Sequence, residues 1–123
     1  MRPNPACWFE IYVQDMPRAR AFYEAVLGGE LTRLNSVDLE MWAFPGDPAT
    51  PGCGGALVHI PGCPSGGGGA IVYFACEDCA VEEARVEAAG GKLHRSKLSI
   101  GEYGFITLAV DPDGNLFGLW SQQ

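Results

Sequence analysis

The chain has 123 residues, 47% of them hydrophobic, and 8 Lys and Arg stand against 15 Asp and Glu, a net charge of −7. This length suits one domain with one core, and the apolar fraction excludes a largely disordered chain. No run approaches about 18 apolar residues, so no membrane span is predicted. Without a Lys/Arg cluster, nucleic acid and anionic membranes are not expected as partners. The N-terminus lacks the apolar segment of a secretory signal, so a cytoplasmic location is expected.

The first half of the sequence predicts a strand, a helix and then three more strands. Residues 8–13 alternate and are rich in β-forming side chains, the pattern of a half-buried strand. Asp15 can cap the helix that follows, and Gly28 can end it. The remaining strands are predicted over residues 31–34, 37–44 and 55–60. The helix should bury a stripe formed by Ala21, Phe22, Ala25 and Val26.

The second half repeats this order, and the repeat is the strongest signal in the chain. The run Gly28-Gly-Glu-Leu31 recurs as Gly90-Gly-Lys-Leu93, a shift of 90 − 28 = 62 residues. A repeat at half the chain length predicts two copies of one β-α-β-β-β module. A single domain over residues 1–123 would then hold module one at about 6–61, a linker at 62–69 and module two at about 70–123.

In the second copy, Asp78 can cap a helix over residues 80–89. The run Asp111-Pro-Asp-Gly114 is strong turn chemistry, so the last two strands should pair as a hairpin. Strands are predicted over residues 70–75, 105–110 and 116–120, with a further short one from residue 93.

A glycine-rich run separates the two copies at residues 62–69. A phosphate-binding loop follows a strand, opens a helix and usually carries a Lys. This run leads into a strand and holds no Lys, so a flexible linker is the favoured interpretation.

Five cysteines are present, and two of them, Cys76 and Cys79, form one CxxC motif. A redox site needs the first Cys at a helix N-terminus, and a zinc site needs two further ligands. Cys76 instead closes a strand, and there is no second pair. Packing or surface thiols are therefore favoured over a redox or zinc role.

Three motifs, in this order, resemble the vicinal oxygen chelate superfamily, the glyoxalase/bleomycin-resistance/dioxygenase group. They lie at residues 13–23 with Leu27-Gly28, at residues 88–91 and at residues 111–115. The resemblance implies an α+β fold in which two tandem βαβββ modules form a half-open, cup-shaped mixed β-sheet around a small-molecule site. It also implies a homodimer, because small members of this family commonly pair their sheets across subunits.

Metal-dependent members of this family bind a divalent ion through His, Gln or Glu on the first and fourth strands of each module. Family alignment and the internal shift of 62 together place these positions at Trp8, Ala56, Ala70 and Gly118. None of these side chains offers an oxygen or imidazole donor. The chain is therefore predicted to bind no metal and no other cofactor, which argues against glyoxalase and extradiol dioxygenase activity.

The walls of the implied cup supply the predicted ligand-binding residues. Strand alternation places Glu10 on the face of Trp8, and Trp120 on the face of Gly118, while Tyr103 could form a lid. The same aromatic side chains could instead fill the cup as core, and the sequence leaves this alternative open. The full predicted set is Trp8, Glu10, Tyr12, Trp42, Val58, Ala70, Val72, Tyr103, Gly118 and Trp120.

Glu10 is the carboxylate predicted on the cup wall, and its burial would require a partner such as the Tyr103 hydroxyl, a backbone N–H or water. It would anchor a planar or cationic ligand beside the tryptophans, or act as a catalytic general base. The resemblance therefore implies a metal-free protein that binds a small molecule, with drug sequestration as one form. The alternatives are a glyoxalase-like lyase or isomerase that uses Glu10 as base, and a dimeric interaction module without a ligand.

Overall fold

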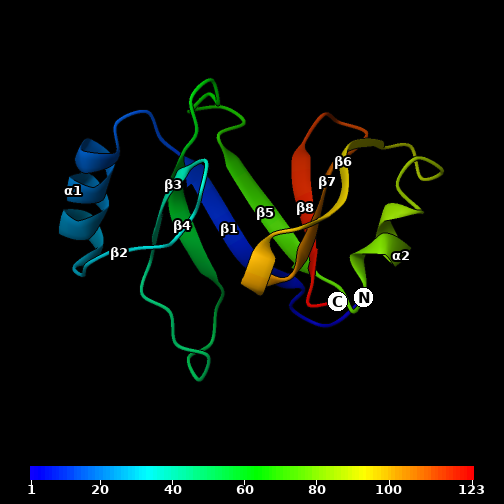
Figure 1. Cartoon of the computed structure of the whole chain (residues 1–123), viewed down its shortest axis with the longest axis horizontal. Coiled ribbons are helices and arrows are strands. Elements are labelled where there is room, and N and C mark those ends of the chain that lie inside the picture. Colours follow the sequence, from blue (N-terminus) through cyan, green and yellow to red (C-terminus); the bar gives the residue numbers. More distant parts are fainter. The chain divides into compact units, whose positions relative to one another are not determined.

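The computed structural model describes residues 1–123, which divide into two compact units. We call Trp8–Ala70 the N-terminal unit, and Met1–Cys7 with Ile71–Gln123 the C-terminal unit. The predicted α+β class is confirmed, since strands dominate and helices are few (Figure 1). None of the helices combines the length and the apolarity that crossing a bilayer requires.

The N-terminal unit places its strands in the order β2-β3-β4-β1. β1 and β4 are parallel, whereas β3 is antiparallel to both of its neighbours. The helix α1 begins after Asp15, whose side chain accepts from the Arg18 amide, and it ends at Gly28 in the left-handed conformation. Both caps were predicted. The elements are β1 (Ala6–Tyr12), α1 (Met16–Leu27), β2 (Thr32–Arg33), β3 (Glu40–Ala43) and β4 (Gly54–His59).

The core of this unit lies between α1 and one face of its strands. Met16 of α1 is buried against Leu31 and Leu57. Tyr23 contributes from the helix as well. Its ring meets that of Phe44 edge to face, with 5.8 Å between the ring centroids, a spacing typical of aromatic pairs. The core-facing line of α1 is therefore Met16, Ala19 and Tyr23.

The predicted buried stripe of α1 is wrong. Ala21 and Ala25 are exposed, and Phe22 and Val26 remain 58% and 63% exposed. An Ala-rich helix offers two apolar lines at helical spacing, and periodicity alone cannot tell which of them meets the sheet.

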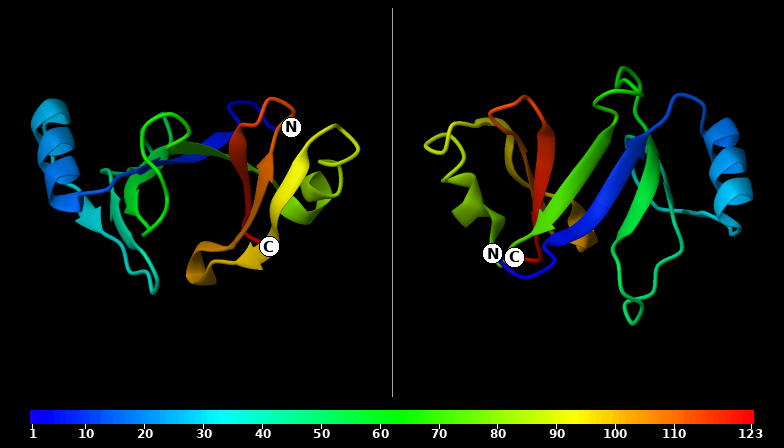
Figure 2. Two further views of the ribbon diagram at one scale, coloured as in Figure 1. Left: turned by 90° about the horizontal axis from the view of Figure 1, so that it is seen from above. Right: turned by 180° about the vertical axis from the view of Figure 1, so that it is seen from behind.

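The C-terminal unit places its strands in the order β5-β8-β7-β6. β5 and β8 are parallel, and β7 and β8 form the predicted hairpin around Asp111, whose side chain accepts from the Asn115 amide. Figure 2 gives two further views of these strands and of α2. The elements are β5 (Ala70–Ala75), α2 (Cys79–Glu83), β6 (Lys92–Ser99), the 3-10 helix η1 (Gly101–Tyr103), β7 (Phe105–Val110) and β8 (Leu116–Ser121).

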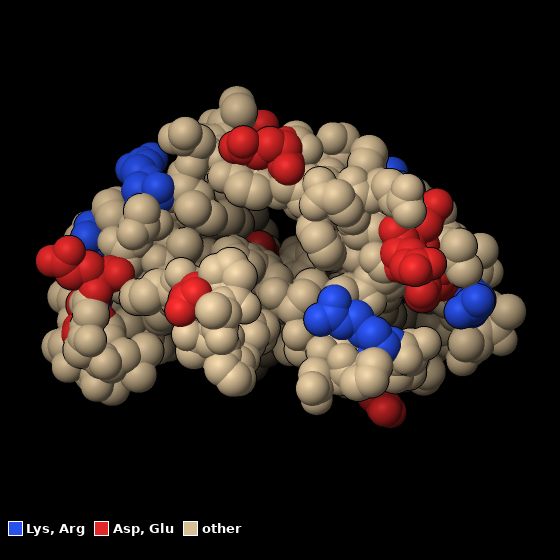
Figure 3. All heavy atoms as spheres, turned by 90° about the horizontal axis from the view of Figure 1, so that it is seen from below, with Lys and Arg blue, Asp and Glu red and all other residues tan.

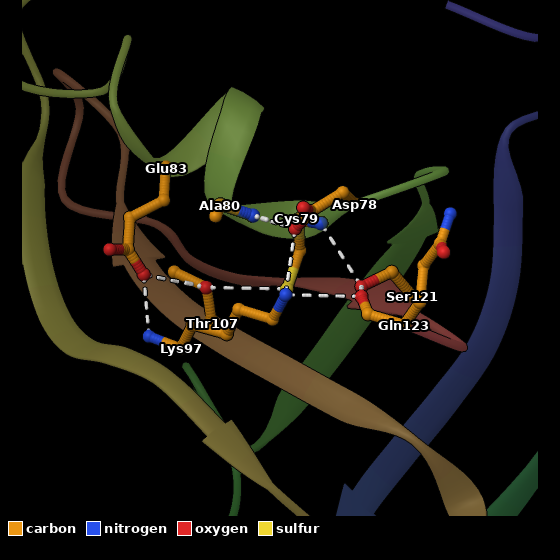
Figure 4. Close-up of polar contacts among 8 residues, drawn as sticks. All are labelled: Asp78, Cys79, Ala80, Glu83, Lys97, Thr107, Ser121 and Gln123. Carbon is orange, nitrogen blue, oxygen red and sulfur yellow. Dashed lines mark hydrogen bonds and ion pairs between the residues drawn. The ribbon is translucent and has the colours of Figure 1, made fainter.

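A polar network attaches α2 to the neighbouring strands (Figure 4). The buried Thr107 hydroxyl donates to Glu83 at 2.8 Å, and the Lys97 amide donates to the same carboxylate oxygen. The Lys97 ammonium meets Asp78 at 2.7 Å, and the Cys79 amide donates to the Ser121 hydroxyl at 3.0 Å. These contacts hold a helix much shorter than the predicted 80–89.

Candidate functional site

The N-terminal unit contains a buried carboxylate between two aromatic side chains of the same strand. Glu10 is only 7% exposed. The Trp8 indole donates to its Oε2 at 3.3 Å, and the Tyr12 hydroxyl donates to its Oε1 at 3.0 Å. Burial, followed by the nearby Glu10 carboxylate, raises the pKa of Tyr12 far above its usual range. The Tyr12 hydroxyl therefore stays protonated and remains a hydrogen-bond donor to Glu10 over the whole physiological pH range.

The two donors to Glu10 come from positions on either side of it in β1. Strand alternation brings residues two apart onto one face, so the predicted grouping of these three side chains holds locally. The predicted partners of Glu10 are the Tyr103 hydroxyl, a backbone N–H or water. The Trp8 and Tyr12 donors are not among them, although strand alternation indicates both.

Small side chains of β4 lie beside this carboxylate. In the parallel register Glu10 is opposite Ala56, and Tyr12 is opposite Val58. Both β4 residues are fully buried. Trp8 is opposite Gly54, where an added Cβ would lie 3.1 Å from the indole ring. Glycine at this position therefore leaves room for the Trp8 ring to lie close over β4.

Trp42 does not lie on this face, so its predicted place beside Trp8 is wrong. It is opposite Leu57 in the β3–β4 register and packs against the core under α1. The Arg20 guanidinium lies 3.5 Å from its ring centroid, and its indole donates to Glu40. The residues of β3 on the Glu10 face are instead Met41 and Ala43, opposite Val58 and Ala56. Sequence alternation could have found them only with the register already known.

In the C-terminal unit, Gly118 and Trp120 share a face, as predicted, but Val72 does not. Gly118 is opposite Tyr73, and Phe74 is opposite Leu119. Alternation places Val72 with Phe74 on the other side of the strand, and Ala70 follows the same alternation. Their predicted place on the Gly118 face is therefore wrong. Tyr73 occupies it instead, since a Cβ on Gly118 would lie 2.1 Å from its ring.

The cause of this error is a shift of one residue. The two helix N-caps, Asp15 and Asp78, differ by 78 − 15 = 63, whereas Ala56 and Gly118 differ by 62. The first strand and the helix of the two copies are therefore 63 residues apart, whereas their fourth strands are 62 residues apart. A slip of one residue moves every side chain of a strand to the opposite face, so the counterpart of Trp8 is Ile71, not Ala70.

The metal that the family pattern implies does not fit either unit. The corrected positions are Trp8 and Ala56 in one unit and Ile71 and Gly118 in the other, and none of them is a ligand for a hard or borderline cation. No group of three His, Cys, Asp or Glu side chains is placed to hold a metal ion.

Tyr103 lies exposed in η1 and is tied to β8 through its backbone. Its carbonyl accepts from the Trp120 indole at 2.7 Å, which satisfies the polar edge of that ring. Gly104 follows with a φ of 104°, and a Cβ there would lie 2.5 Å from the Ser121 carbonyl oxygen. The turn after η1 therefore requires glycine. Its hydrogen bond identifies Tyr103 as a support for Trp120, and a lid role stays a prediction.

The first thiol of the CxxC motif, Cys76, is not activated. All five cysteines are free, and Cys79 is fully buried. Burial, with a smaller contribution from the Glu82 carboxylate, raises the pKa of the Cys76 thiol to about 11. A thiol that stays protonated at neutral pH is a poor nucleophile, so the packing interpretation is the one this geometry favours.

The glycine-rich run is anchored rather than free. The Gln14 amide donates to the Cys63 carbonyl and to the Ser65 hydroxyl, and Ser65 donates in turn to the Tyr12 carbonyl. The Tyr12 amide donates to the Gly69 carbonyl at 2.7 Å. A hollow of about 290 Å³ lies between this run, the end of β1 and the start of α1. The flexible linker predicted from composition is thus tied to the strand that carries Glu10.

Charged side chains form small, separate groups of both signs on the face drawn in Figure 3. No continuous basic patch is present on that face, in line with the net charge of −7. A polyanionic partner would find no extended site on this surface.

Comparison with known proteins identifies a family and a fold. The sequence model of the Glyoxalase/Bleomycin resistance protein/Dioxygenase superfamily matches residues 7–119, whereas no curated protein matches the chain. Methylmalonyl-CoA epimerase from Mycobacterium tuberculosis has a TM-score of 0.70 and 14% identity, over 100% of this chain and 93% of its own. A variant of the Streptomyces coelicolor epimerase in complex with 2-nitronate-propionyl-CoA has a TM-score of 0.68 and 18% identity, over 95% and 96%. At identities this low, the likeness shows a shared fold.

Proposed function

Because the chain belongs to the glyoxalase/bleomycin resistance protein/dioxygenase superfamily, we propose that it binds a small molecule on the Glu10 face of β1, without a bound metal. This Glu10 face consists of Trp8, Glu10 and Tyr12 with Ala56 and Val58 of β4. The expected ligand is planar and cationic. Sequestration of a cationic drug is the form of this function that we favour.

The buried Glu10 carboxylate carries this proposal. A buried charge costs free energy, and an apolar side chain of similar volume is often as stable or more so. A carboxylate at this position is therefore better explained by a ligand than by folding. Trp8 and Tyr12 orient it by their hydrogen bonds, and their ring faces attract cations.

Calorimetric titration with bleomycin tests the proposal. The wild-type protein should bind it, and Glu10→Gln should weaken binding by about 1 to 3 kcal/mol, roughly 5- to 150-fold, because a charge-assisted hydrogen bond is lost. Glu30→Gln removes one charge from an exposed position and is the matched control, with unchanged binding expected. Absence of binding to the wild type, or equal binding by Glu10→Gln, would rule this function out.

A second candidate function is a glyoxalase-like isomerase or lyase in which Glu10 takes a proton from a substrate carbon. The observation that favours it is again the buried carboxylate, now combined with the fold shared with methylmalonyl-CoA epimerases. A general base must reach the proton it removes. Methylmalonyl-CoA incubated with the protein in D2O should then gain deuterium, detected by mass spectrometry. Exchange with the wild type but not with Glu10→Gln supports this candidate, and no exchange contradicts it.

A further inference from the structure

A second hollow of the N-terminal unit, of about 280 Å³, lies where α1 ends and the chain turns towards β2. Leu27 is 66% exposed and forms part of its wall, so we call it the Leu27 hollow. An exposed leucine in a concave apolar wall is surface that a ligand can remove from water. The apolar wall consists of Tyr23, Leu27, Leu31, Phe44 and Pro45.

The charged side chains around the Leu27 hollow are all of one sign. Glu24 and Glu30 line it, and no Lys or Arg does. The last turn of α1 contains no basic residue, although the C-terminal end of a helix is partly negative and favours a cation. A cationic ligand would complement this end of the helix, whereas an anionic ligand would be repelled.

Glu24 is the carboxylate placed to bind such a cation. Its side chain is 24% exposed, so solvent screens its charge less than that of the exposed Glu30. Its Oε2 accepts from the Leu31 amide at 2.8 Å and lies 3.7 Å from the Arg20 guanidinium. That guanidinium in turn lies over the Trp42 ring, 3.5 Å from its centroid. Because both contacts of the carboxylate use Oε2, the Leu31 amide holds Glu24 in place while Oε1 can accept from a ligand.

The volume of the Leu27 hollow limits the ligand to a small molecule. A dry apolar cavity of about 150 Å³ binds benzene, and drug-sized ligands occupy pockets of about 300 to 1,000 Å³. A hollow of about 280 Å³ therefore suits one aromatic ring with a short chain. Tyr23 and Phe44 meet edge to face in its wall, and aromatic side chains attract both other rings and cations.

We propose that the Leu27 hollow binds a small arylalkyl ammonium ion, with its ring against the apolar wall and its N–H groups donating to Glu24. The occupant is identified by charge and by size, since the wall is apolar, its charged side chains are acidic and its volume admits one ring. This site is independent of the proposed function, because none of its residues belongs to the Glu10 face.

Titration of the whole chain with phenethylammonium, followed by the NMR signals of the backbone amides, tests the site. Binding should saturate and should shift the signals of Leu27, Leu31 and Phe44. Phenethyl alcohol has the same ring without the charge, and it should bind about tenfold more weakly. The proposal is overturned by shifts that do not saturate, by equal binding of the alcohol, or by shifts confined to the Glu10 face.

Glu24→Gln tests the anchor. It keeps an acceptor oxygen for the Leu31 amide but removes the charge, so phenethylammonium should bind about tenfold more weakly, with phenethyl alcohol unaffected. Glu87→Gln is the matched control, because Glu87 is the counterpart of Glu24 in the second copy (87 − 24 = 63) and is exposed there. It should bind phenethylammonium like the wild type. Equal binding by Glu24→Gln and the wild type contradicts the role of Glu24, and the comparison of the two probes on the wild type does not depend on the folding of any variant.

Discussion

At the scale of single residues, Glu10 is a buried carboxylate that receives hydrogen bonds from donors on its own strand. Its neighbours two positions away, Trp8 and Tyr12, supply one hydrogen bond to each oxygen. A local strand segment can therefore supply hydrogen-bond donors to both oxygens of a buried carboxylate. Prediction of this face needed only the alternation of β1, whereas the position of Trp42 depended on the register of another strand.

Tyr12 should make stability depend on pH at the alkaline end. Its pKa in the folded protein is raised, chiefly by burial, whereas an unfolded Tyr ionises near pH 10, at about its reference value. Above that pH the unfolded state holds fewer protons than the folded state, so the free energy of unfolding falls as pH rises. Urea denaturation between neutral pH and about pH 11 should show a steeper fall for the wild type than for Tyr12→Phe.

Tyr103→Phe is the control for this measurement, because it removes the hydroxyl of an exposed Tyr. It should keep the wild-type dependence on pH. The same slope for the wild type and Tyr12→Phe would show that Tyr12 does not ionise differently in the two states.

At the scale of elements, α1 shows which parts of a helix local sequence determines. Its N-cap Asp15 and C-cap Gly28 act through their own backbone neighbours, and both were predicted. The face that α1 buries depends on contacts with Leu31, just beyond the helix, and with Leu57 of β4, which is distant in the sequence. The helix in the second copy was predicted too long for a related reason, since apolar spacing says little about where a helix stops.

Gly28 should be required because of its left-handed backbone conformation, and not because a side chain would lack room there. Its φ is 72°, and no atom lies within 4 Å of an added Cβ. Gly28→Ala should therefore lose about 1 to 2 kcal/mol of unfolding free energy from left-handed backbone strain alone. Gly46→Ala is the matched control: the site is equally open, and without that strain it should be neutral or slightly stabilising. Equal effects of the two changes in urea denaturation would contradict this account.

At the scale of the whole molecule, the chemistry of the ligand positions leads us to expect that this chain, unlike the metal-dependent members of its family, binds no metal. The corrected positions Trp8, Ala56, Ile71 and Gly118 provide no donor, a conclusion that survives the one-residue correction. The purified protein should therefore hold well under one equivalent of zinc, nickel, iron or manganese by elemental analysis, and a chelator should leave its melting temperature unchanged. Near-stoichiometric metal after purification would show that another set of residues binds it.

The sequence by itself determined the α+β class, the family, both caps of α1, the β7–β8 hairpin and the common face of Trp8, Glu10 and Tyr12. These features follow from local patterns, because turn chemistry, capping and strand alternation act between close neighbours. Tertiary structure alone decided which line of α1 is buried and which faces Trp42 and Val72 occupy. The buried line of α1 depends on packing against Leu57, which is distant in the sequence. The faces of Trp42 and Val72 depend on the register between strands, where one residue of error exchanges the two faces of a sheet.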